Sequence, residues 1–90
     1  MKTITKEKAR TEAKTEKCWQ VILHNCYCHF FEEVVHQLTK ALGCSIDTAE
    51  EYTFAAERIG FVSVFHGTKS KCENVANILG ETGLNVEVVQ

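Results

Sequence analysis

The periodicity of apolar residues constrains this chain most strongly, because it alternates between the strand pattern and the helix pattern within residues 18–90. Residues 19–23 form a short apolar run of strand-forming residues. The next apolar residues recur at spacings of three and four, which predicts an amphipathic helix over residues 30–42 that ends at Gly43. The predicted inner face of this helix consists of Phe30, Phe31, Val34, Val35, Leu38, Ala41 and Leu42.

A second helix and a second strand follow. Ser45 is predicted to cap the helix, and Gly60 is predicted to stop it. Its predicted inner face consists of Ile46, Ala49, Tyr52, Thr53, Ala56 and Ile59. Residues 61–65 have the composition of a strand, and His66 with Gly67 is predicted to turn the chain.

A third helix and a last strand complete the pattern. Thr68 or Ser70 is predicted to cap the helix, and Gly80 or Gly83 is predicted to end it. Its predicted inner face consists of Cys72, Val75, Ala76 and Leu79. Residues 84–89 alternate well enough for a half-buried strand. This strand-helix-helix-strand-helix-strand order predicts an α/β (α+β) domain, a two-layer sandwich with a three-stranded sheet.

Charge divides the chain into two parts. Residues 1–17 hold six cations and three anions, whereas residues 18–90 hold four cations and nine anions. Ile4 is the one strongly apolar residue of the first segment, so the segment cannot offset its ordering entropy by burial. We therefore expect a disordered charged arm at 1–17, either a solubilising tail or a segment that contacts a partner. A single folded domain at 18–90 follows, because 90 residues close one core of modest depth.

Composition excludes several function classes. A formal net charge of −2 argues against a nucleic-acid partner, which normally requires a basic excess. No apolar run approaches the roughly 18 residues of a membrane span, and the first residues lack the apolar middle of a signal peptide. Five cysteines are an odd number, which favours free thiols in a reducing compartment. We expect a cytoplasmic monomer without a membrane partner.

The run from His24 to His29 holds two cysteines and two histidines, which are ligands for zinc or copper. Cys26 and Cys28 are separated by one residue, however, whereas a common zinc knuckle has two between its cysteines. A metal or thiol module using Cys26, Cys28 and the histidines stays open as an alternative to a simple turn. Cys28 and His29 are adjacent, but nucleophilic catalysis requires an orienting third group in space. No nucleotide-binding or metalloprotease motif is present, so we predict no enzyme, no metal and no cofactor.

The start of the folded body resembles the ClpS family, the adaptors of the Clp protease system. Residues 19–25 contain the Val-Ile-Leu-x-Asn run with which these adaptors begin their fold. Glu32, Val34, Val35 and Leu38 then match the family's first helix in register. The order of the remaining elements also agrees, so the resemblance covers about residues 18–90. The charged arm matches in kind, since these adaptors carry a mobile N-terminal extension.

The resemblance implies a binding module that acts in proteolysis by the N-end rule, in which the N-terminal residue marks a protein for degradation. ClpS adaptors hold the bulky apolar N-terminal residue of a substrate protein in a small pocket. They deliver the substrate to an AAA+ Clp unfoldase of the ClpA or ClpC type, whose N-terminal domain they bind. An asparagine and acidic residues after the first strand, with a histidine from the second helix, take the substrate's amino group.

Several pocket positions depart from the family pattern. By register, Asn25 keeps the asparagine, but Cys26 and Tyr27 occupy the acidic positions and Glu57 occupies the histidine position. His29 falls on a threonine-like position. The floor positions fall on Phe31, Val34, Thr53, Ala56 and Leu84. Two versions stay open: a modified pocket with Asn25, His29 and Glu57 around the amino group, or an interaction module whose pocket is lost.

Two residues have alternative interpretations, and the whole chain has one more. Glu57 either pairs with the amino group or is a solvated charge near a helix end. Phe31 is bulkier than the methionine usual in the family, so it either fills the pocket or belongs to the core. The C-terminal domain of the ribosomal stalk protein has a similar element order, but the body of this chain has too few lysines for that function.

Overall fold

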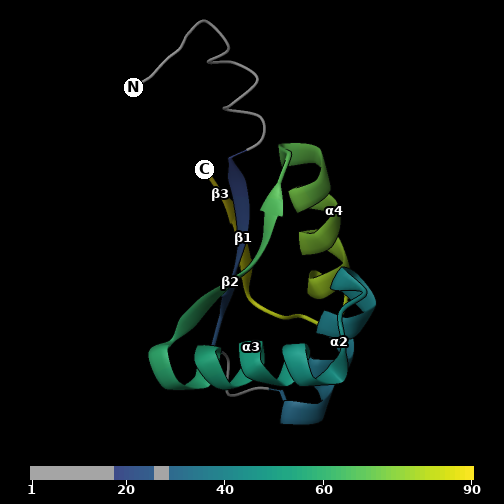
Figure 1. Cartoon of the computed structure of the whole chain (residues 1–90), viewed down its shortest axis with the longest axis vertical. Coiled ribbons are helices and arrows are strands. Elements are labelled where there is room, and N and C mark those ends of the chain that lie inside the picture. Colours follow the sequence, from purple (N-terminus) through teal and green to yellow (C-terminus); the bar gives the residue numbers. More distant parts are fainter. Residues whose placement is uncertain (1–17, 26–28) are drawn as a thin grey trace, which may run out of the picture.

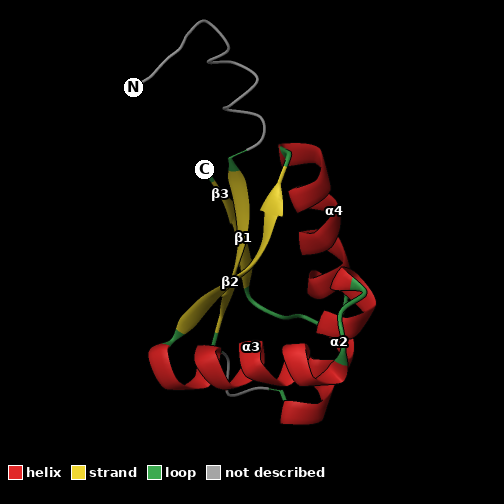
Figure 2. Ribbon diagram, viewed as in Figure 1, coloured by secondary structure: helices red, strands yellow, loops and turns green. Residues whose placement is uncertain are grey.

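The computed structural model describes residues 18–25 and 29–90. The predicted arm at 1–17 lies outside the described residues. The elements, in chain order, are β1 (Trp19–His24), α2 (Phe31–Leu42), α3 (Ile46–Ile59), β2 (Phe61–Gly67), α4 (Lys69–Gly80) and β3 (Val86–Val89). This is the predicted order, and Figure 2 shows α4 beside the strands and α3 across their end.

The sheet has the strand order β2-β1-β3, and β1 pairs antiparallel with both neighbours. The register shifts between Val21 and Ile22 on the β2 side. The predicted turn at His66 and Gly67 is wrong, because both residues continue β2 opposite Gln20 and Trp19. Since β1 begins at Trp19, it supplies hydrogen-bonding partners up to Gly67, and this pairing overrides the local turn preference.

The last strand is shorter than predicted, because it begins at Val86 instead of residue 84. Leu84 is 6% exposed and packs in the core before the strand begins. The carbonyl oxygen of Asn85 accepts a hydrogen bond of 2.9 Å from the backbone N–H of His24. Pairing starts where β1 can supply a partner, with Leu23 opposite Val86.

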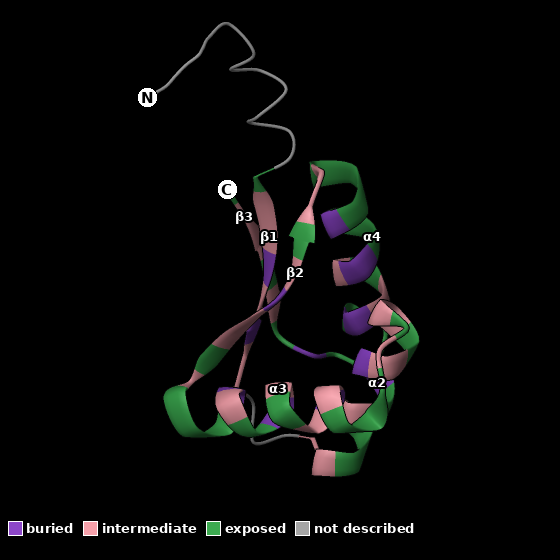
Figure 3. Cartoon of the chain, in the orientation of Figure 1, coloured by how far each residue is buried: buried purple, intermediate pink, exposed green. Residues whose placement is uncertain are grey.

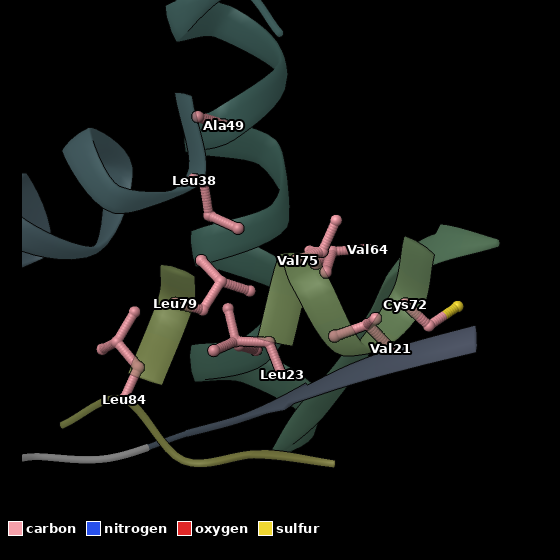
Figure 4. Close-up of a cluster of buried hydrophobic side chains, with 10 residues drawn as sticks. Val21, Leu23, Leu38, Ala49, Val64, Cys72, Val75, Leu79 and Leu84 are labelled. Atoms are coloured by element: carbon pink, nitrogen blue, oxygen red, sulfur yellow. The ribbon is translucent and has the colours of Figure 1, made fainter. Parts of the chain in front are cut away.

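The helices cover one face of the sheet (Figure 1). α4 lies along the sheet and contacts all three strands, whereas α3 crosses one end of the sheet and contacts β2. α2 packs against α3 and α4. The core between these layers, drawn in Figure 4, consists of Val21, Leu23, Leu38, Ala49, Ala56, Val64, Cys72, Val75, Leu79 and Leu84.

The helix boundaries follow the predicted capping residues. Ser45 Oγ accepts a 3.2 Å hydrogen bond from the backbone N–H of Thr48 at the start of α3. Thr68, not Ser70, caps α4, because Thr68 Oγ1 accepts from the backbone N–H of Lys71 at 3.2 Å. Gly60 ends α3 in the left-handed conformation at φ 107°. None of the helices within 18–25 and 29–90 is both long enough and apolar enough to cross a membrane.

Figure 3 shows the buried positions of α4 on the side that faces the strands. Three predicted inner-face residues of the other two helices are exposed instead. Phe30 is 75% exposed, Ile46 is 63% exposed and Ile59 is 67% exposed. Phe30 precedes α2 as its extended cap, and the two isoleucines are the first and last residues of α3. These positions lie at or beyond the helix ends, which the neighbouring elements do not cover. The buried face of α3 is made by Ala49, Thr53 and Ala56.

Candidate functional site

A cavity lies at the end of β1, where that strand meets α2, α3 and the segment before β3. It is lined by Leu23, His24, Asn25, His29, Val34, Thr53, Ala56, Glu57 and Leu84. Its volume is about 20 Å³. Seven of the ten predicted site residues are therefore brought together: Asn25, His29, Val34, Thr53, Ala56, Glu57 and Leu84. Cys26 and Tyr27 lie outside the described residues.

Asn25 is fixed by hydrogen bonds on both sides of β1. Its backbone N–H donates to the carbonyl oxygen of Gly60 at 2.9 Å. The preceding backbone N–H, of His24, donates to the carbonyl of Asn85 at 2.9 Å. These two bonds fix the position at which the chain leaves the sheet. This position lies between the start of β2 and the segment before β3. The half-buried side chain of Asn25 is thereby presented to the cavity.

The floor of the cavity is apolar except for one hydroxyl group. Leu23 is 2% exposed, and Ala56 and Leu84 are also buried. Thr53 is 2% exposed, and its hydroxyl donates to the carbonyl of Ala49 at 2.8 Å, which is the usual intrahelical bond of a buried threonine. The Thr53 oxygen keeps its acceptor capacity, because donating a hydrogen bond leaves the hydroxyl lone pairs in place.

One carboxylate stands at the rim. Glu57 is exposed on α3, and its side chain forms no ion pair or hydrogen bond within the described part of the chain. The side-chain amide of Asn25 likewise has no partner among the described residues. Because none of the described residues that line the cavity is a lysine or arginine, this rim favours a cationic ligand.

The two histidines of the rim are held by β3 and the segment before it. His24 Nε2 lies 2.9 Å from Glu87 Oε1 on β3. His29 Nε2 donates to the carbonyl oxygen of Thr82 at 2.6 Å, since a carbonyl can only accept. Gly83 follows with φ 85°, and a Cβ atom built there would lie 3.7 Å from His29 Nε2. His29 therefore ties the α2 side of the cavity to the segment before β3.

Phe31 does not line this cavity. Its ring centroid lies 4.9 Å from that of Phe54, with an interplanar angle of 47°. It lines a second groove, between α2 and α3, with a volume of about 270 Å³. The other residues of this groove are Glu32, Val35, His36, Thr39, Ile46 and Glu50. The structure therefore leaves Phe31 beside the neighbouring helix and does not use it to close the cavity.

Leu23 and His24 line the cavity but were not among the predicted site residues. Both belong to β1 and directly precede Asn25. The sequence could have indicated both residues, because the last residues of a strand lie beside a site that forms where the strand ends. In the sequence, Leu23 has the pattern of an apolar strand residue and His24 that of a candidate metal ligand, so neither pattern by itself indicates a cavity.

The described cysteines and histidines do not form a metal centre. Within 18–25 and 29–90, no group of three or more His, Cys, Asp or Glu residues is placed to hold an ion. Cys26 and Cys28, on which the metal alternative depends, lie outside the described residues. Cys72 is fully buried, and this burial raises the pKa of its thiol while a backbone hydrogen bond from Gly67 acts in the opposite direction. It packs as a small apolar residue, as predicted.

Comparisons with known proteins agree with this fold. The family model described as "ATP-dependent Clp protease adaptor protein ClpS" matches residues 14–87. Among solved structures, the chain is similar to Agrobacterium tumefaciens ClpS2 bound to L-phenylalaninamide, with 22% identity and a TM-score of 0.69. That match covers 82% of this chain and 96% of the other, and it supports the fold. No curated protein sequence matched. Because the family model spans most of the sequence, this chain belongs to the ClpS family of Clp protease adaptors.

Proposed function

We propose that this adaptor captures the free N-terminus of a substrate protein in the cavity at the end of β1. One observation supports the proposal most strongly. The side chains of Asn25 and Glu57, which have no partner among the described residues, line the same cavity as the buried Leu23, Ala56 and Leu84. An α-ammonium group needs acceptors or an anion at the mouth of a site, and the side chain beside it needs apolar walls.

Glu57 is the central residue of this amino-group site. A neutral acceptor such as the Asn25 amide contributes roughly 1 kcal/mol net, and a charge-assisted bond to a carboxylate is about twice as strong. The family's histidine position is occupied by Glu57, so the carboxylate replaces part of the charge that Cys26 and Tyr27 no longer supply. Glu57 is exposed, so salt screens this attraction more than it would screen a buried pair.

Capture is followed by delivery to an AAA+ Clp unfoldase of the ClpA or ClpC type, through the N-terminal domain of that unfoldase. This function requires no bond to be made or broken, no cofactor, no nucleic acid and no membrane. The adaptor acts as a cytoplasmic monomer. Residues 1–17 serve as a charged arm that contacts the unfoldase or the substrate during handover.

The test compares peptides that differ only at the amino group. Isothermal titration of a free-amino peptide and its N-acetylated twin should show binding of the free form alone. Glu57→Gln should weaken the free-amino peptide by about tenfold, which corresponds to the loss of one charge-assisted contact. Glu50→Gln is the matched control, because Glu50 lies on the same helix but lines the α2–α3 groove. Equal affinity for both peptides would contradict amino-group capture.

A second function has a specific observation in its favour. The cavity volume of about 20 Å³ is small for a bulky side chain, which favours an interaction module whose N-terminal pocket is lost. In that case the chain binds the unfoldase, but no peptide shows dependence on its amino group. The same acetylation experiment separates the two functions.

A further inference from the structure

We propose that the groove between α2 and α3 is a docking site for residues 2–6 of the chain's own charged arm. In this arrangement Ile4 packs on the apolar surface of the groove, and Lys2 and Lys6 pair with the carboxylates at its rim. The groove shares no lining residue with the cavity at the end of β1, so this inference does not rest on the proposed capture of N-termini. Three observations carry it: the exposed apolar surface, the charge of the rim and the charge pattern of the arm.

The groove presents apolar side chains to its surroundings. Ile46 is exposed at the start of α3 and lines the groove. Phe54 is 52% exposed, and its ring lies 4.9 Å from that of Phe31, which lines the groove from α2. Val35 is half-buried in the same lining. Apolar side chains gathered in this way are typical of a surface on which another polypeptide segment packs.

The rim of the groove is acidic. Glu32 of α2 and Glu50 of α3 supply one carboxylate from each wall. Neither carboxylate forms an ion pair or a hydrogen bond with another described residue. The other polar lining residues are His36 and Thr39, and none of the described lining residues is a lysine or an arginine. The groove therefore favours an occupant in which cations flank an apolar side chain.

The arm carries that pattern. Residues 1–17 hold six cations and three anions, whereas the rest of the chain is acidic. Ile4 stands between Lys2 and Lys6, two positions from each. In an extended segment these three side chains project from the same side, because the strand repeat is two residues. The long stems of the two lysines allow their ammonium groups to reach either wall of the groove while Ile4 lies between them.

The arm is long enough to reach the groove. It joins the fold at Trp19, where β1 begins. β1 spans six residues, or about 20 Å, and the residue after it is hydrogen-bonded to Gly60 at the end of α3 (Figure 1). Glu50 lies ten residues, or about 15 Å, back along α3. The path along both elements is therefore about 35 Å, and residues 7–18 can extend over roughly 40 Å.

The contacts need not be strong, because the arm and the groove belong to the same chain. Ion pairs at an exposed rim contribute little individually and are screened by salt. The apolar contact of Ile4 adds to them. Tethering gives the arm an effective concentration on the order of millimolar at the groove, so the contacts together hold it. Docking covers Ile46 and Phe54, and a partner that takes the cations of the arm uncovers them.

The experiment compares the full chain with a full-length arm variant that combines Lys2→Glu, Ile4→Ser and Lys6→Glu, both labelled with ¹⁵N. We expect the amide resonances of the two chains to differ at the residues that line the groove and to agree at those that line the cavity. Relaxation of the ¹⁵N nuclei of residues 2–6 should report more restricted motion in the unchanged chain. Salt at about 1 M, where the screening length is about 3 Å, should move the groove resonances toward those of the variant.

Exchange of the charges tests the pairing itself. Glu32→Lys combined with Glu50→Lys should release the arm, so that residues 2–6 gain the mobility that they have in the arm variant. Adding Lys2→Glu and Lys6→Glu to this chain should restore the restricted motion, because opposite charges face each other again. Retention of the restricted motion in the chain that carries only the two groove substitutions would overturn the role assigned to the carboxylates.

The matched control combines Glu51→Lys with Glu73→Lys. Both residues are exposed and neither lines the groove, so the net charge changes by the same amount at other places on α3 and α4. This control should leave the arm docked. Loss of docking in the control as well would show that net charge, and not the groove, holds the arm. Thermal melting of every variant establishes that it is folded.

The remaining outcomes separate this occupant from others. If the arm variant and the unchanged chain agree throughout the groove, docking of the arm is wrong. If they differ at the cavity instead, the arm lies in the cavity and the assigned site is wrong. If the groove resonances change with protein concentration and sedimentation velocity detects a dimer, the arm of a second copy fills the groove and docking within one chain is wrong.

Discussion

The backbone N–H of Asn25 donates to the carbonyl oxygen of Gly60 at 2.9 Å. This bond joins the residue after β1 to the residue that links α3 with β2. Gly60 can make the link because it adopts φ 107°, a conformation that residues with a Cβ atom rarely adopt. The position of the candidate amino-group ligand therefore depends on a glycine from a distant part of the sequence.

Substitution of Gly60 should reduce both stability and binding. A Cβ atom at Gly60 would meet nothing within 4 Å, so the cost of Gly60→Ala is conformational, about 1–2 kcal/mol. For a domain of this size, each kcal/mol of lost stability lowers Tm by roughly 4–8 °C. Peptide affinity should also fall, because relaxation of the strain moves Asn25.

Gly80→Ala is the matched control for Gly60→Ala. Gly80 is the last residue of α4, its Cβ position is also open, and its φ is not positive. This variant should melt at or slightly above the unchanged chain, since alanine favours a helix. Equal losses of stability in the two variants, measured by differential scanning calorimetry, would show that the left-handed conformation is not the cause.

The cap of α4 distinguishes two polar residues that are separated by one position, Thr68 and Ser70. Thr68→Ala removes the oxygen that accepts from the backbone N–H of Lys71, so the free energy of unfolding should fall by about 1 kcal/mol. Ser70→Ala should be neutral or slightly stabilising, because Ser70 is exposed inside the first turn and its side chain caps nothing. Urea denaturation of both variants measures the difference. A larger loss from Ser70→Ala would contradict the assigned cap.

Stability should decrease in alkaline solution partly through Cys72. Burial raises the pKa of this thiol above its ordinary value of 9.0, so the folded chain retains a proton that the unfolded chain releases. The contribution of this thiol to stability is therefore fully present below pH 9.0 and is lost as the pH rises through the folded pKa. In Cys72→Ala, the slope of the unfolding free energy against pH above that value should be smaller. An identical slope would contradict this contribution.

The expected arm gives a prediction about delivery. Deletion of residues 1–17 should leave the affinity for N-terminal peptides unchanged, because the described cavity is built entirely from residues 23–84. The same deletion should slow degradation of a substrate by the Clp protease, if the arm contacts the unfoldase or the substrate. Measurement of both quantities on the full and shortened chains separates capture from delivery. Undiminished degradation would leave the arm as a solubilising tail.

The sequence predicted the elements well where local chemistry determines them. Ser45 and Thr68 are caps because their hydroxyl groups satisfy free backbone N–H groups within the first turn. The site on α3 also follows from local spacing. Thr53, Ala56 and Glu57 are separated by three and four residues, so they share one side of the helix and line one cavity.

Tertiary packing determined what the sequence did not predict. Phe31 and Val34 both belong to the apolar stripe of α2, but Phe31 contacts Phe54 and lines the groove, whereas Val34 lines the cavity. A helix stripe is broad enough to face two neighbours, and periodicity does not say which neighbour each residue meets. The volume of the cavity is likewise set by how β1, α2 and α3 approach one another, which no residue spacing reveals.

Nuclear magnetic resonance tests amino-group capture most directly, because it reports on Asn25 and Glu57 themselves. The chain is labelled with ¹⁵N and ¹³C and titrated with peptides that have a free N-terminus and, separately, with their N-acetylated twins. We predict that a free peptide shifts the Asn25 side-chain amide and the Glu57 carboxyl resonances in a saturable manner, while its acetylated twin does not. Saturable binding that shifts neither residue, or equal shifts from both peptides, would contradict the account.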